Sequence, residues 1–164
     1  MLTLRNPTAL DLPPLYTLAI DSADKFLDDY TTFDADYARE ILGTMPCQVI
    51  ADEYEYPMGL VWFSEKHDDL HAKIHCLIRP EAWKRVLQQD IMGLAVDWAF
   101  DTLGIGKVLA EPFSTQTSAI KLLRKYRFME HRPFYKHTKQ KGVIVDMIPF
   151  EARRSFWRKT RGQR

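Results

Sequence analysis

The chain has 164 residues, of which 46% are hydrophobic and 12% aromatic, and its formal net charge is +1. This length and composition predict one domain with a sizeable hydrophobic core. No run of about 18 apolar residues is present, which argues against a membrane-spanning helix. The first residues also lack the apolar stretch and cleavage site of a secretion signal.

The two cysteines, Cys47 and Cys76, lie far apart in sequence and belong to no CxxC motif. We interpret both as small buried hydrophobic residues and expect no disulfide, which fits a reducing cytoplasm. His67, His71 and His75 are spaced like ligands on one face of a helix. The residues around them favour a turn and a strand, however, so we expect no metal site.

The first half of the chain is predicted to contain two helices. Asp11 is expected to cap a helix over residues 12–23, in which two prolines fall in the first turn. Asp34 is expected to cap a second, short helix that stops at Gly43. Strands are predicted over residues 2–6, 48–52 and 58–63.

The central part of the chain predicts a strand, a buried helix, a second strand and a second helix. Apolar and polar side chains alternate in the first strand, which Pro80 ends. The first helix is apolar around most of its circumference, as expected of a mostly buried helix. The expected bounds are residues 71–78, 90–104, 107–113 and 115–128.

Two strands joined by a helix of this length indicate a βαβ unit. In such a unit, the loop between the end of a strand and the start of a helix points backbone amides at a bound ligand. We therefore expect any chemical site to lie around the loop over residues 79–89.

The end of the chain predicts a closing hairpin and a basic tail. The hairpin arms are residues 129–137 and 143–148, and they turn at Lys141-Gly142. We place the domain at residues 1–150 and the tail at residues 151–164. The tail carries six basic residues against one acidic residue.

Three interpretations of the tail stay open. Phe156 and Trp157, flanked by Arg153, Arg154 and Arg158, are typical of a hydrophobic anchor for a protein partner. A frayed, solvated terminus is the second interpretation, although exposing two large aromatic side chains is unfavourable. Nucleic-acid binding is the least favoured, because no recognition motif accompanies the charge.

The predicted order of elements is β-α-α-β-β-β-α-β-α-β-β. It defines an α/β (α+β) fold with a mixed sheet and helices on both faces. The sheet is expected to be antiparallel at first and parallel around the fourth strand, because short connections keep sequential elements adjacent.

This order resembles the GCN5-related N-acetyltransferase (GNAT) superfamily, including acetyltransferase-like proteins of tailed bacteriophages. The similarity is sharpest at RPEAW, residues 79–83, and at AIKLLRKYRF, residues 119–128. It implies a mostly antiparallel sheet in which the fourth and fifth strands splay apart, with acetyl-CoA between them. Backbone groups of Leu77, Ile78 and Arg79 would then hold the acetyl and pantetheine parts.

The pyrophosphate loop of this family carries R-G-x-G/A, whereas the matching residues here are Trp83-Lys84-Arg85-Val86. Glycines in such a loop allow backbone amides to approach phosphate oxygens closely. The resemblance places Lys84, Arg85 and Val86 at the cofactor, and the first two would bind phosphate through their side chains. Gln116 stands where the family has an asparagine.

Acetyl transfer to an amine needs a base for the amine proton and donors that polarise the thioester. His75, on the polar face of the fourth strand, is the candidate base. The alternative is an ordinary solvated strand histidine.

Two functions follow from the resemblance. The first is an acetyl-CoA-dependent N-acetyltransferase that acts on a small-molecule or peptide amine in the cytoplasm. The alternative is a catalytically inactive domain of this fold that serves as a structural or interaction module, for example within a phage particle. The missing loop glycines favour the second function, and the RPEAW segment with its two-helix frame favours the first.

Overall fold

The computed structural model describes residues 1–27, 34–67, 70–131 and 136–161, without the side chains of residues 23–26 and 66–67. The strands are β1 (Thr3–Arg5), β2 (Cys47–Ala51), β3 (Pro57–His67), β4 (His71–Ile78), β5 (Lys107–Ala110), β6 (Met129–Glu130), β7 (Lys136–Gln140), β8 (Val143–Met147) and β9 (Phe150–Arg153). The α-helices are α1 (Leu12–Phe26), α2 (Ala35–Thr44), α3 (Trp83–Gln88), α4 (Ile91–Asp101), α5 (Thr117–Lys125) and α6 (Arg154–Arg161). Two 3₁₀ turns, η1 (Ala9–Asp11) and η2 (Pro80–Ala82), precede α1 and α3.

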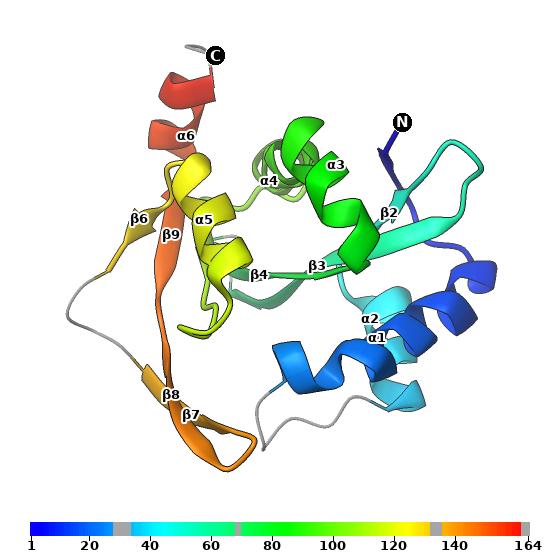
Figure 1. Cartoon of the computed structure of the whole chain (residues 1–164). Helices are drawn as coiled ribbons and strands as arrows, with labels where there is room; N and C mark the ends of the chain where they lie inside the picture. Colours follow the sequence, from blue (N-terminus) through cyan, green and yellow to red (C-terminus); the bar gives the residue numbers. More distant parts are fainter. Residues whose placement is uncertain (28–33, 68–69, 132–135, 162–164) are drawn as a thin grey trace.

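The described strands form a seven-stranded sheet in the order β1-β2-β3-β4-β5-β9-β6, while β7 and β8 pair with each other in a separate hairpin (Figure 1). Within the large sheet β4 and β5 are parallel, and the other neighbours are antiparallel. The predicted fold class is therefore confirmed, including the parallel pair at the fourth and fifth strands.

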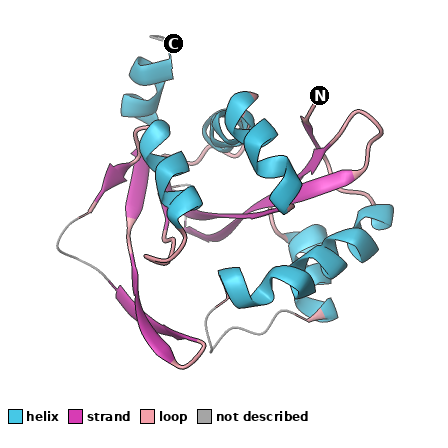
Figure 2. Ribbon diagram, in the orientation of Figure 1, coloured by secondary structure: helices cyan, strands magenta, loops and turns pink. Residues whose placement is uncertain are grey.

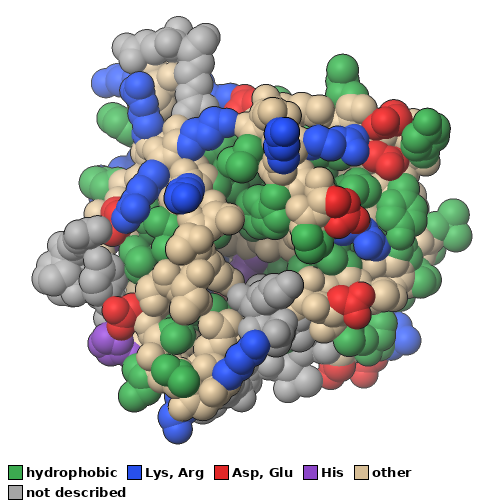
Figure 3. All heavy atoms as spheres, in the orientation of Figure 1, with side chains coloured by type: hydrophobic (Ala, Val, Ile, Leu, Met, Phe, Trp, Pro, Cys, Tyr) green, Lys and Arg blue, Asp and Glu red, His purple; other side chains and the backbone are tan. Residues whose placement is uncertain are grey.

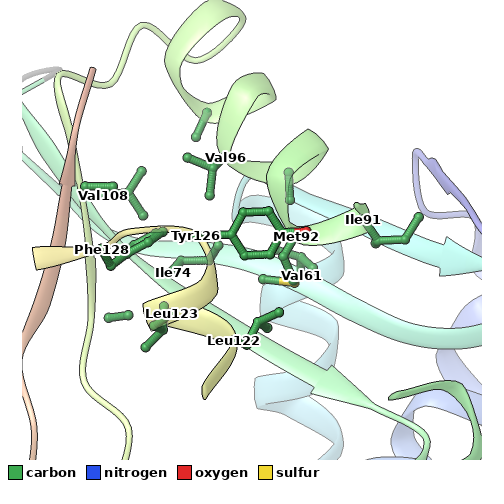
Figure 4. Close-up of a cluster of buried hydrophobic side chains, with 14 of the residues drawn as sticks. Val61, Ile74, Ile91, Met92, Val96, Val108, Leu122, Leu123, Tyr126 and Phe128 are labelled. Carbon is green, nitrogen blue, oxygen red and sulfur yellow. The ribbon is translucent and has the colours of Figure 1, made fainter. Parts of the chain in front are cut away.

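Helices cover both faces of the sheet (Figure 2). On one face α1 and α2 bury Leu15, Leu18 and Ile41 against Leu60 and Leu77. On the other face α3, α4, α5 and α6 enclose the larger core, whose side chains converge in Figure 4. Strand β4 is apolar toward both faces, because its even-numbered side chains enter one core and Leu77 enters the other. Among the described residues, no helix combines the length and apolarity needed to cross a bilayer.

The starts of the two N-terminal helices differ in how well the sequence predicted them. Asp34 caps α2 as expected, since its carboxylate accepts a hydrogen bond from the Tyr37 amide at 2.8 Å. Asp11 does not cap α1, because η1 leads directly into that helix. Its carboxylate instead accepts hydrogen bonds from the Thr8 amide and from the guanidinium of Arg5. Helix α2 also continues one residue past Gly43.

The segment over residues 79–89 was predicted to be a loop, and this prediction was wrong. It forms η2 and then α3. Trp83, Val86 and Leu87 are spaced three and four residues apart, so a helix brings all three to the core side. Val86 is 0% exposed, and its burial provides the free energy that favours a helix here.

The closing hairpin is confirmed at its turn but not in its first arm. Lys141 and Gly142, with φ of 53° and 75°, join β7 to β8 as predicted. Residues 129 and 130 form β6 instead, which pairs with β9. The part of the predicted arm at residues 132–135 lies outside the described residues.

The segment after residue 150 packs into the fold, contrary to the expectation of an exposed aromatic anchor. Strand β9 lies between β5 and β6, and Trp157 on α6 is only 3% exposed. Its indole contacts the rings of Phe100, Tyr126 and Phe128 at centroid distances of 5.9–6.1 Å. The indole Nε1 also donates to Asp97 Oδ1 at 2.6 Å. Trp157 is therefore a core residue.

Most of the basic charge in this segment is paired within the chain. Arg161 forms ion pairs with Asp90 and Asp97 of the α4 region. Arg154 and Arg158 both approach Asp101, at 3.6 and 2.8 Å, and Arg153 pairs with Glu151. The three acidic residues that lie along α4 thus hold α6, which leaves Phe156 as the exposed aromatic residue of the expected anchor.

Replacing Trp157 with alanine should lower the free energy of unfolding by about 3–5 kcal/mol, because it removes a buried indole and opens a cavity. Urea unfolding followed by circular dichroism measures this change. The neighbouring Phe156→Ala is the control, and since Phe156 is 55% exposed we expect it to change stability by less than about 0.5 kcal/mol. Equal effects of the two substitutions would contradict the packing of α6 described above.

Candidate active site

Strands β4 and β5 pair over three residues and then diverge. Their parallel pairing joins residues 71–73 to residues 107–109 and then ends. Strand β3 continues beside β4 as far as Ile78. From Ile74 to Ile78, the β4 edge that faces β5 therefore pairs with no described strand. The splayed strand pair that the resemblance implies is present.

The register of β3 and β4 determines which backbone groups face this gap. The Arg79 amide donates to Met58 O at 2.9 Å, so residues 73, 75 and 77 also exchange hydrogen bonds with β3. Because the direction of peptide groups alternates along a strand, those of Ile74, Cys76 and Ile78 point toward the gap. An extended ligand with amide groups can pair with this edge.

The three residues predicted to hold the acetyl and pantetheine parts differ in what they offer. Ile78 presents its peptide group to the gap. Leu77 turns its backbone toward β3 and its side chain into the core beneath α1 and α2. The Arg79 side chain donates to Pro57 O and Tyr56 Oη, both at 3.1 Å, and lies over the Tyr56 ring. The Arg79 side chain thus stabilises the start of β3.

The residues predicted to bind phosphate lie on α3. Lys84 is exposed, Arg85 pairs with Glu53 at 3.0 Å, and Val86 has no exposed surface. Because η2 runs directly into α3, the amides of residues 83–88 continue along the helix axis toward preceding carbonyls and do not converge on an external anion. The glycine-type phosphate nest is therefore absent from residues 83–88, and only the pantetheine part of CoA meets a fitting backbone edge.

Gln116 and Lys125 form hydrogen bonds at the two ends of α5. The Gln116 side chain accepts a hydrogen bond from the Phe113 amide at 3.0 Å and closes the turn between β5 and α5. The ammonium of Lys125 donates to Leu87 O, which ties the end of α5 to the end of α3. Figure 3 shows this face of the molecule hollowed between α3 and α5.

His75 lies at the start of the gap and on the α1–α2 side of the sheet. Its ring stacks on Trp62 with centroids 5.0 Å apart, and its Nε2 is 2.7 Å from Ser64 Oγ. Burial, and then the positive charge of Lys73, lowers the pKa of His75 to about 4. The imidazole is therefore neutral at pH 7 and keeps one nitrogen lone pair.

Glu111, directly after β5, is a site residue that the sequence did not reveal. Its side chain is 10% exposed and accepts hydrogen bonds from Lys73 at 3.1 Å and Lys136 at 2.6 Å. Burial favours the neutral acid, but the bonds from Lys136 and Lys73 outweigh it and lower the pKa of Glu111. The carboxylate is charged at neutral pH. Only the fold brings β4, β5 and β7 together around it.

The comparisons with known proteins agree with this geometry. Residues 1–129 match the family model for the acetyltransferase (GNAT) domain, and the chain belongs to this family. No curated protein sequence matches the chain.

Solved structures of similar shape include the spermidine/spermine N-acetyltransferase from Vibrio cholerae in mutant forms. It has a TM-score of 0.80 and 19% sequence identity, over 97% of this chain and 97% of that chain. The spermidine N-acetyltransferase from the same organism, in complex with CoA and spermine, also has a TM-score of 0.80. Its identity is 20%, over 95% of this chain and 97% of that one. At these identities the similarity shows the fold, and neither protein supports a resemblance to phage proteins.

The pKa of His75 predicts a pH dependence of stability. The folded value of about 4 lies below the ordinary value of 6.5, so between these values the unfolded chain binds more protons at this site. The contribution of His75 to the free energy of unfolding should be complete above pH 6.5. It should fall by up to roughly 3 kcal/mol as the pH drops to 4.

Urea unfolding of the wild type and of His75→Phe at several pH values tests this, because phenylalanine keeps a ring against Trp62 and does not titrate. The difference in stability between the two proteins should change with pH between 4 and 6.5 and stay constant above that range. A constant difference throughout would contradict the lowered pKa.

Proposed function

We propose that this chain transfers the acetyl group of acetyl-CoA to an amine nitrogen. The observation that carries the proposal is the free edge of β4 from Ile74 to Ile78, in a chain that belongs to the acetyltransferase family. A pantetheine arm contains two amide groups, which can add to such an edge as a further strand would. The CoA bound to the similar Vibrio cholerae structure also supports this proposal.

Acetyl-CoA would supply the acetyl group as a thioester. In the proposed step the amine nitrogen forms a bond to the acetyl carbon, the bond from carbon to sulfur breaks so that CoA leaves as its thiolate, and the amine loses a proton. Peptide N–H groups on the free edge beside His75, such as that of Cys76, would polarise the thioester carbonyl. His75 takes the amine proton on its free lone pair, either directly or through the Ser64 hydroxyl at 2.7 Å.

We further propose that the amine is a polycation. Residues 21–40, which contain the end of α1 and the start of α2, carry seven acidic residues against two basic ones. Of these acids Asp21, Asp34, Asp36 and Glu40 are exposed in the structure. Helices α1 and α2 lie on the same side of the sheet as the His75 side chain, so these charges attract a cation toward that side. The spermine bound to the similar Vibrio cholerae structure supports a substrate of this kind.

The activity test is an incubation of the full chain with acetyl-CoA and spermidine, measured by release of the CoA thiol and by mass spectrometry of the acetylated amine. We expect kcat/KM for spermidine to exceed that for a monoamine of similar length by about tenfold at low salt, and the advantage to shrink as salt is added. A peptide amine serves as the second comparison. Binding of CoA without acetylation of any amine would instead favour the inactive interaction module.

The role of His75 has its own test. His75→Gln should lower kcat by about a hundredfold, because it removes the proton acceptor. His137→Gln, on the exposed β7–β8 hairpin, is the control and should leave kcat unchanged. In the wild type, kcat should fall only as the pH approaches 4, where His75 becomes protonated. An acid limb near 6.5, or full activity of His75→Gln, would remove His75 from the reaction.

A further inference from the structure

We infer that this chain acetylates one of its own lysines, Lys136 on strand β7, as well as a free amine. This inference rests on the proposed function, because it uses the same donor and the same proton acceptor. It assigns a covalent modification site to a lysine side chain that the fold holds beside the gap between β4 and β5.

The first step is the position of Glu111 relative to His75. The last parallel pair of β4 and β5 joins Lys73 to Leu109. Two residues further along each chain segment, His75 stands level with Glu111. Side chains two residues apart share a face of a strand, and Lys73 reaches Glu111 at 3.1 Å on this face. His75 and Glu111 therefore border the gap from opposite sides, on the same face of the sheet.

The second step is that Glu111 holds the ammonium of Lys136 at 2.6 Å. The even-numbered residues of β7 share one face, and this face is turned to the body of the molecule, since Gln140 Nε2 donates to Leu27 O at 3.2 Å. The odd-numbered residues point the other way, and they include the exposed Lys139. Of the two lysines on β7, Lys136 is therefore the one beside the gap.

The third step is that Glu111 also accepts a hydrogen bond from Lys73, and this second lysine is held more firmly. The Lys73 side chain is 17% exposed and donates to Glu65 at 2.8 Å as well as to Glu111. Burial disfavours its charge, but the bonds to the two carboxylates outweigh burial and raise the pKa of Lys73. Lys136 is 63% exposed and has one carboxylate partner among the described residues. Lys136 can therefore leave Glu111 and reach the thioester, whereas Lys73 stays an ammonium.

The reaction at Lys136 follows the course proposed for a free amine. A first proton, lost to solvent, leaves the Lys136 nitrogen with a lone pair. This nitrogen then forms a bond to the acetyl carbon, the bond from carbon to sulfur breaks so that CoA leaves as its thiolate, and His75 takes the second proton. The product is a neutral amide, which no longer forms an ion pair with Glu111. Loss of this positive charge makes the surroundings of Glu111 more negative and more attractive to a polycation.

The test is incubation of the full chain with acetyl-CoA and without added amine, followed by mass spectrometry of the intact chain and of its peptides. We expect one added acetyl group, located on Lys136, at a rate that does not change with protein concentration, because acceptor and site belong to one molecule. Lys136→Arg keeps a cation for Glu111 but lacks the amine, so it should lose this modification. His75→Gln should slow the modification about a hundredfold, as it slows transfer to a free amine.

The matched control is Lys139→Arg, which changes the lysine on the other face of the same strand and should be acetylated at Lys136 like the wild type. Equal acetylation of Lys136 and Lys139 in the wild type would indicate direct chemical reaction of exposed lysines and would overturn the inference. A rate that rises in proportion to protein concentration would overturn it as well, because transfer would then occur between molecules. Melting temperatures close to that of the wild type will verify that both arginine variants fold.

The result with spermidine separates this inference from the proposed function. Acetylation of spermidine by a chain whose Lys136 stays unmodified would overturn the self-acetylation and leave the proposed function intact. If the chain acetylates neither spermidine nor itself, the proposed function is overturned and the self-acetylation with it.

Discussion

The candidate site depends on one mismatch in the sheet, which is that β5 ends while β4 continues. Strand β4 has eight residues and β5 has four, and both begin at the paired residues His71 and Lys107. Pro112 follows soon after β5 and has no amide hydrogen for a ladder, so β5 does not extend beside the rest of β4. Strand β3 supports β4 to its end, and Gly59 permits this because a Cβ there would lie 2.5 Å from Leu77 O. The free edge is thus rigid although it is unpaired.

The position of α3 beside this edge depends on packing of α4 and α6, which lie farther from the edge. Helix α4 lies against the sheet, and α6 holds α4 from outside through Trp157 and through ion pairs to Asp90, Asp97 and Asp101. Asp90 itself adopts a positive φ of 58°, which permits the sharp change of direction from α3 to α4. The C-terminal segment therefore supports the position of α3, and with it one margin of the hollow.

Charge is separated around the hollow in a way that suits two ligands of opposite sign. Lys84 on α3 and Lys121 on α5 are exposed and form no ion pair with any described residue, and both helices lie on the side where we propose that the donor binds. Acidic residues dominate the sequence from the end of α1 into α2, where we propose that a cationic amine approaches. Between them, His75 is neutral, and Glu65 and Glu111 balance the charges of Lys73 and Lys136, so the centre adds little net charge. This separation accounts for both parts of the proposed function.

The sequence by itself determined the features that depend on neighbouring residues. Alternation gave the bounds of β4, Asp34 marked the start of α2, and Lys141-Gly142 marked the turn of the hairpin, because each is set by local backbone geometry. Only the tertiary structure decided that burial of Val86 makes residues 83–88 helical and that Trp157 lies in the core. It also decided that Glu111 meets two lysines from other strands. Burial and pairing of this kind depend on surfaces that distant segments supply, and a linear pattern does not contain them.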